Sequence, residues 1–78
     1  MERSSVSSSC LKSVGHDAQR RVLEIEFTNE GLYRYFDVPA EEHQALLEAK
    51  SLGTYFNEEI KNRYRFLMIR PPRRGSRF

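Results

Sequence analysis

The stretch "RVLEIEFTNEGLYRYFDV", residues 21–38, decides the fold. Within residues 21–27 the side chains form two alternating sets, which is typical of a strand with one buried face. One set is Leu23, Ile25 and Phe27, and the other is Val22, Glu24 and Glu26. After the turn "TNEG", residues 28–31, the stretch "LYRYFDV" has the composition of a second strand. Two strands joined by so short a connection run antiparallel. The sequence therefore predicts a β-hairpin at the centre of the protein.

The length of the turn sets the register of this hairpin. If residues 29–31 form a three-residue loop with Gly31 in the left-handed region, Glu26 lies across from Arg34 as a favourable charge pair. A two-residue loop would instead bring Arg34 to the apolar face, where an unpaired arginine is costly. We prefer the first register, which turns Tyr33 and Tyr35 toward the core. The alternative for these two tyrosines is an exposed platform for stacking bases.

The segments on either side of the hairpin complete the fold. We expect one more strand from Ser9 to Val14. Pro39 suits the start of a helix within residues 38–50, and a second helix begins near Thr54, with Phe56, Ile60 and Tyr64 repeating every four residues. The predicted fold class is α+β, a three-stranded antiparallel β-meander followed by two helices packed on one face.

A chain of 78 residues has room for one small domain. Residues 1–8 are Ser-rich and predict a flexible segment, residues 9–69 the domain, and residues 70–78 a basic disordered tail. No apolar run approaches the roughly 18 residues of a membrane span, so we expect no membrane contact. A lone cysteine, Cys10, is compatible with a reducing cytoplasmic location.

The charge of the chain is concentrated at one end. Residues 61–78 carry seven cations and no acid, and residues 1–60 carry six cations and eleven acids, so +7 and −5 give the net +2. Such asymmetry indicates a polyanionic partner. The alternative is a solvated tail that only aids solubility.

These patterns point to a nucleic-acid-binding site. Arginine and lysine side chains bind phosphates, and exposed aromatic rings stack on the bases of single-stranded RNA. We therefore expect a module that binds RNA, tRNA included, and acts as a monomer; the alternative is a protein partner bound at the exposed sheet face or edge. The candidate residues are Tyr33, Arg34, Tyr35, Lys61, Arg63, Arg65, Arg70, Arg73, Arg74 and Arg77.

Catalytic and metal-binding patterns are weak. Cys10 has no neighbouring base, whereas a nucleophile needs an oriented base within hydrogen-bond reach. Together with His16 and His43 it could form at most an incomplete zinc site. We predict no enzymatic activity, no cofactor and no metal.

Taken in order, the segments "SVGHD", "LEIEF", "EGLYRYFDVP" and "LLEAKSLGTYFNEEIKNRY" resemble the KTSC domain family. This short module is named for its presence at the C-terminus of some lysyl-tRNA synthetases. The family's central Y-x-Y falls on residues 33–35, and its later glycine, aromatic and asparagine pattern falls on Gly53 and residues 55–57. His16 stands where the family usually has tyrosine. The resemblance implies an α+β domain for which RNA binding has been suggested.

Overall fold

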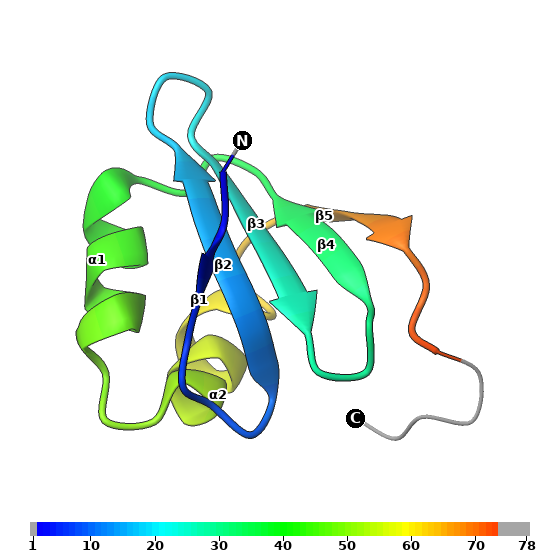
Figure 1. Cartoon of the computed structure of the whole chain (residues 1–78). Helices are drawn as coiled ribbons and strands as arrows, with labels where there is room; N and C mark the ends of the chain where they lie inside the picture. Colours follow the sequence, from blue (N-terminus) through cyan, green and yellow to red (C-terminus); the bar gives the residue numbers. More distant parts are fainter. Residues whose placement is uncertain (1, 74–78) are drawn as a thin grey trace.

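The computed structural model describes residues 2–73 of the 78-residue chain. It is an α+β fold in which one antiparallel sheet has the strand order β1-β2-β3-β4-β5 (Figure 1). The strands are β1 (Ser4–Ser5), β2 (Leu11–Asp17), β3 (Val22–Phe27), β4 (Leu32–Tyr35) and β5 (Phe66–Arg70). The helical segments are α1 (Ala40–Glu48), α2 (Leu52–Tyr55) and the π-helical η1 (Phe56–Ile60). Figure 1 shows α1 beside the β1–β2 side of the sheet and β5 at the opposite edge.

The predicted α+β class is confirmed, but the prediction of three strands is wrong, because the sheet has five. The extra strands are the two edges, β1 and β5. Strand β1 consists of two serines within the segment expected to be flexible, and it pairs with β2 through Ser4 opposite Val14. An edge strand is held by backbone pairing to one neighbour and needs no apolar alternation, so polar residues give no sequence signal for it.

The second helix is shorter than expected. It begins at Leu52, where the Ser51 side chain accepts a hydrogen bond from the Thr54 backbone N–H, and the helical path ends at Ile60. The expected line of Phe56, Ile60 and Tyr64 stops at Ile60, and residues 66–70 form β5. A run of four apolar residues is compatible with either a helix or a strand, and here it forms a strand that pairs with β4.

The central hairpin has the predicted faces but a different register. Its loop is residues 28–30, closed by a 2.8 Å hydrogen bond from Phe27 N–H to Gly31 C=O. Glu30, rather than Gly31, has positive φ (73°). The register is thus shifted by two residues from the predicted one, and Arg34 lies opposite Glu24 instead of Glu26. A shift of two residues preserves the faces, because side chains alternate with period two.

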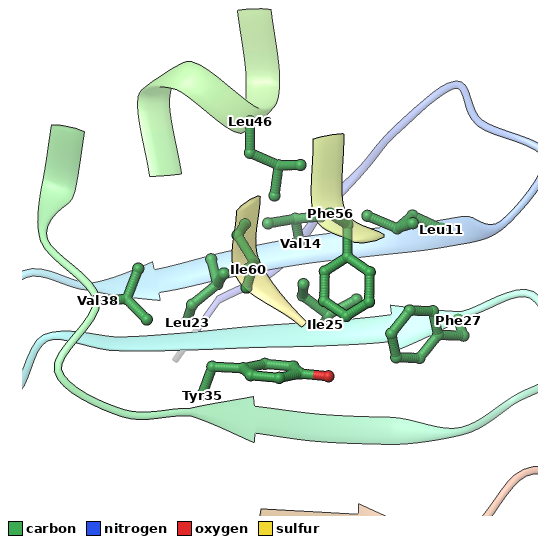
Figure 2. Packing of buried hydrophobic residues seen from close by; sticks show 10 residues of the cluster. All are labelled: Leu11, Val14, Leu23, Ile25, Phe27, Tyr35, Val38, Leu46, Phe56 and Ile60. Atoms are coloured by element: carbon green, nitrogen blue, oxygen red, sulfur yellow. The ribbon is translucent and has the colours of Figure 1, made fainter. Parts of the chain in front are cut away.

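The core lies between the helices and the middle of the sheet. Leu46 from α1 and Phe56 and Ile60 from η1 point toward Leu23 and Ile25 of β3 (Figure 2). Four of these five side chains have no exposed surface, and Phe56 is 2% exposed. Fully burying one such side chain contributes about 1.5–3 kcal/mol. This layer is the main source of stability in so small a domain.

The helices are also joined to each other by polar contacts. The Glu42 carboxylate on α1 accepts hydrogen bonds from the hydroxyls of Tyr55 and Tyr64. The hydrogen bond to Glu42 raises the pKa of Tyr55 to about 12. Tyr55, the last residue of α2, is half-buried, and its hydrogen bond to Glu42 joins α2 to α1.

Candidate interaction surface

Strand β5 carries a cluster of exposed apolar side chains. Phe66, Leu67, Met68 and Ile69 are 56%, 54%, 48% and 41% exposed, respectively. Among residues 2–73 the only other large hydrophobic residue of comparable exposure is Leu47, at 41%. Exposed apolar side chains on an edge strand are a feature of many interaction sites, which makes β5 a candidate for one.

An open pocket of about 330 Å³ lies where β5 meets the sheet face on the helix side. Its floor is aromatic: the Tyr33 and Phe66 rings lie 5.8 Å apart between centroids, and the Tyr35 and Phe66 rings 5.7 Å apart. We call this hollow the ring pocket. Its lining residues are Phe27, Asn29, Tyr33, Tyr35, Lys61, Asn62, Phe66 and Pro72.

The two tyrosines occupy different positions in the ring pocket. Tyr35 is 4% exposed and belongs to the core, whereas Tyr33 is half-buried and packs against the core from outside. Burial, with a smaller contribution from Tyr33, raises the pKa of Tyr35, so its hydroxyl stays protonated and remains a hydrogen-bond donor. The predicted orientation of both rings toward the core side is confirmed, and Tyr33 nevertheless keeps an accessible surface.

A second, wider hollow adjoins the ring pocket. It shares Lys61, Asn62 and Phe66 with the first and adds Phe36, Tyr64, Arg65 and Leu67. Lys61 joins no ion pair among residues 2–73. A cation without a carboxylate partner therefore stands at the junction of an aromatic pocket and an open groove.

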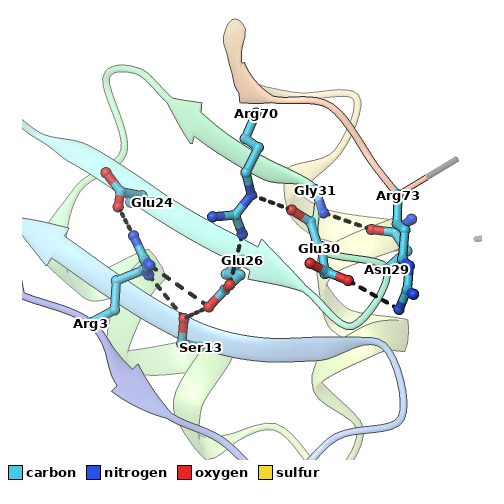
Figure 3. Close-up of polar contacts among 9 residues, drawn as sticks. All are labelled: Arg3, Ser13, Glu24, Glu26, Asn29, Glu30, Gly31, Arg70 and Arg73. Carbon is cyan, nitrogen blue, oxygen red and sulfur yellow. Dashed lines mark hydrogen bonds and ion pairs between the residues drawn. The ribbon is translucent and has the colours of Figure 1, made fainter.

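Most other predicted phosphate-binding cations are paired with the protein's own carboxylates (Figure 3 shows Arg70 and Arg73). Exposed pairs of this kind contribute about 0–1 kcal/mol each and can exchange partners. Arg74 and Arg77 lie outside the described residues. The pairs, with N–O distances, are Arg63–Glu59 (3.1 Å), Arg65–Asp37 (3.3 Å), Arg70–Glu26 (2.7 Å) and Arg73–Glu30 (3.4 Å).

The described part of the chain has no net charge. Removing Arg74 and Arg77 from the 13 lysines and arginines leaves 11, which equals the 11 acids, all of them within residues 2–73. Arg70, expected to begin the tail, is the last residue of β5, and the Arg73 N–H donates to the Asn29 carbonyl. The basic terminal segment of the sequence therefore folds back, up to Arg73, onto acidic residues.

Arg34 lies on the opposite face of the sheet from the ring pocket. It donates from Nε to Glu24 Oε2 at 2.8 Å, and Arg3 also pairs with Glu24. Burial opposes ionisation of Glu24, but the hydrogen bonds from Arg34 and Arg3 outweigh it and lower the pKa of this carboxyl. On the same face a hydrogen bond from Arg70 lowers the pKa of Glu26. Arg34 is thus separated from the tyrosines that flank it in sequence.

Sequence analysis missed Phe66, Asn62 and Asn29 as lining residues. The place of Phe66 beside Tyr33 and Tyr35 depends on β5, a strand that the sequence does not predict. Asn29 was treated as a turn residue, and its side chain does accept the Gly31 N–H at 3.0 Å. A signal for the pocket was present in the run "FLMI" after a helix end, which is also typical of an edge strand.

The two histidines come together, although they are distant in sequence. The His16 and His43 rings stack with centroids 5.0 Å apart, and the His16 Nε2–H donates to the Val38 carbonyl. Among residues 2–73 no three His, Cys, Asp or Glu side chains gather closely enough to hold a metal ion. None of the helices within that range is long and apolar enough to cross a bilayer.

Fold and surface together define a small single-domain α+β module with an open aromatic pocket and an exposed apolar edge strand. The family model of the KTSC domain matches residues 7–64. The chain belongs to the KTSC domain family. Strand β5 follows the matched range.

Relatives and solved structures agree with this membership. The chain is 49% identical over 70 residues to an uncharacterised protein of Stutzerimonas stutzeri, covering 88% of this chain and 99% of that protein. It is similar in structure to a KTSC domain protein of Yersinia pestis, with a TM-score of 0.86 and 39% identity over 88% of this chain and 97% of that chain. A lysine–tRNA ligase of Nostoc punctiforme is 34% identical over 58 residues, which cover 74% of this chain and 10% of the ligase.

Proposed function

We propose that the protein binds single-stranded RNA, with one base in the ring pocket and the backbone following the adjoining hollow. The single observation that carries the proposal is the junction of aromatic rings with Lys61, a cation without an ion-pair partner among residues 2–73. Proteins bind single strands by stacking bases on aromatic rings beside a positively charged groove.

The chemistry of the lining suits a flat polar ring. Tyr33 and Phe66 offer ring faces or edges, and the Asn62 amide and the Tyr35 hydroxyl offer hydrogen-bonding groups. Lys61 and Arg65 stand in the second hollow, where phosphates flanking the bound base would pass. Arg65 would exchange its exposed partner Asp37, itself 75% exposed, for a phosphate at little cost.

The lysine–tRNA ligase relative supports the same ligand class, because its name specifies tRNA.

The proposal differs from a purely electrostatic one in how strongly the affinity for RNA should depend on salt. With only Lys61 and Arg65 at phosphates, the slope of log affinity against log salt should be shallow, roughly −1 to −2. Binding by the whole arginine-rich terminus would give a much steeper slope.

Fluorescence anisotropy with labelled single-stranded oligouridylate and oligoadenylate tests the proposal. Lys61→Ala and Tyr33→Leu should each weaken binding, Tyr33→Leu by roughly 1–3 kcal/mol if a base stacks there. Lys50→Ala is the matched control, since Lys50 is exposed, joins no ion pair among residues 2–73, and lies outside the ring pocket. Equal affinities for all three variants and the unchanged protein would exclude the ring pocket as the site.

A second candidate function is supported by a different observation. The four exposed apolar residues of β5 lie on an edge strand, where a partner can add a strand of its own. This makes the protein a protein-interaction module. Pull-down of a protein partner that is lost with Met68→Lys and kept with Lys61→Ala would favour this candidate.

A further inference from the structure

We infer that the strand added to β5 comes from a second copy of this chain, and that the two copies form a symmetric dimer with one continuous sheet. The inference rests on the second candidate function above and is independent of RNA binding. Edge-to-edge pairing of β5 with β5 is the arrangement that the backbone, the side chains and the charges of this strand support together.

The outer edge of β5 has backbone groups ready to pair. The Phe36 N–H donates to the Arg65 carbonyl at 2.9 Å, so Arg65 directs its backbone groups toward β4, and Leu67 does the same two residues on. Backbone groups of successive residues point to opposite sides of a strand in an antiparallel ladder. Those of Phe66 and Met68 therefore point outward, where no strand among residues 2–73 pairs with them.

The side chains of β5 are apolar on both faces of the sheet. Met68 lies opposite Tyr33 on the helix side, whereas Leu67 lies opposite Arg34 on the other side. Both are about half exposed, at 48% and 54%. A partner strand with one polar face would leave one of these two sides uncovered. A second β5 brings apolar residues to both.

The strand is complementary to itself in an antiparallel register centred on Met68. The two-fold axis then brings Met68 against Met68 of the second copy and Leu67 against Ile69. Phe66 meets Arg70, with the Phe66 ring on the side of the ring pocket and the Arg70 side chain on the opposite face beside Glu26. No two like charges meet within this five-residue register.

The charges around β5 do not oppose association. Arg65 and Arg70, which flank or end the strand, are paired with Asp37 and Glu26 of their own chain. The full chain carries a net charge of only +2, so long-range repulsion between two copies is weak. Because the edge is short, the interface falls in the small class, below about 1,200 Å², and the dimer should form only at micromolar or higher concentration.

A two-fold axis through Met68 that relates two antiparallel strands is perpendicular to the sheet. Both ring pockets, each lined by Phe66, therefore lie on the same face of the joined sheet. The dimer would thus present two such pockets side by side to one ligand. This consequence requires the dimer, whereas the dimer does not require the ligand.

Sedimentation velocity on the full chain, from low micromolar to near-millimolar concentration, tests the inference. The unchanged protein should shift from monomer to dimer, and Met68→Lys and Met68→Glu should each weaken self-association at least about tenfold, because like charges meet at the axis. An equimolar mixture of these two variants should recover the dimer. Leu47→Lys, at an exposed apolar residue on α1, is the matched control and should dimerise normally.

Three results would overturn the inference: an unchanged protein that stays monomeric at every concentration, a mixture as monomeric as its components, or a control that loses the dimer. Isotope-filtered NOEs between Met68 side chains of differently labelled copies need no substitution, and their absence from a dimeric sample would exclude this register. Lys61→Ala should leave dimerisation unchanged. A monomer that still binds RNA would therefore reject the dimer alone.

Discussion

The two halves of the sheet differ in what covers them. Over β2 and β3 the helices bury Leu23 and Ile25 completely. At β5, the far edge in Figure 1, Phe66 and Met68 lie on the helix side of the sheet and are 56% and 48% exposed. Both halves have apolar side chains on the face of the sheet that carries the helices, so the difference lies in the helical layer. The half under the helices holds the core of the domain, and the other half leaves its apolar side chains exposed.

The boundary between the halves falls at the end of η1. Ile60 has no exposed surface, and the next residue, Lys61, is exposed and lines the ring pocket. The chain then turns and pairs β5 with β4 instead of extending the helix across the sheet.

The largest expected loss of stability comes from removing a buried side chain in the covered half of the sheet. Phe56→Ala removes a ring that packs against Phe27 and Tyr35 with centroids 5.2 and 5.4 Å away. We expect a loss of about 3–5 kcal/mol in the free energy of unfolding, enough to unfold most molecules of a marginal domain. Urea unfolding followed by circular dichroism measures it. Phe66→Ala, at the uncovered edge, should cost less than about 1 kcal/mol. Equal losses in the two variants would show that the edge stabilises the fold as much as the covered half does.

A smaller loss of stability is expected from a substitution on the polar face of the sheet, opposite the helices. Glu24→Gln leaves Arg3 and Arg34 without their shared carboxylate and should cost about 1–3 kcal/mol at neutral pH. The pKa of Glu24 is lowered in the folded protein, so this stability is complete above the ordinary value of 4.5 and is lost as the pH falls through the folded-state pKa.

Urea unfolding at pH 7 and at acidic pH should therefore show the gap between Glu24→Gln and the unchanged protein closing in acid. Glu48→Gln is the matched control, since Glu48 lies on the exposed side of α1 and accepts only from Gln44 among residues 2–73. A gap that stays constant with pH would show that the arginine pairs do not stabilise the fold.

The smallest expected effect is a pH dependence of stability that comes from His43 on α1. Burial first, and the neighbouring His16 second, lower the pKa of His43. Because the unfolded chain then binds the proton more tightly, stability should be complete above the ordinary pKa of 6.5 and should decline as the pH falls below it. Thermal melts between pH 8 and pH 5.5 measure this decline, which His43→Gln should reduce. An identical decline in the variant would assign it to other groups.

Much of the covered half could be predicted from the sequence. Alternation in residues 21–27 gave the central strand, and the spacing of Phe56 and Ile60 gave the inward stripe of the second helix. The faces of the hairpin were correct although its register was not, because a shift of two residues leaves every side chain on its own side. Strong periodicity in one segment carries enough information for such predictions.

The uncovered half could not be predicted, because its signals depend on distant segments. Whether "FLMI" continues a helix or pairs with β4 is decided by backbone contacts across more than thirty residues. The cations of the terminal segment suggested a free basic tail, yet Arg70 and Arg73 meet Glu26 and Glu30 of the hairpin. Charge counts along a sequence do not record which charges meet in the fold.

We propose that this protein binds RNA at the uncovered half of the sheet. Titration of isotope-labelled protein with single-stranded RNA, followed by amide and side-chain NMR shifts, tests it most directly. We predict that shifts concentrate at Tyr33, Lys61, Asn62 and Phe66, while the amides of Glu24 and Leu46 stay unchanged. Shifts centred on the Glu24 face, or no shift at any residue at low salt, would contradict it.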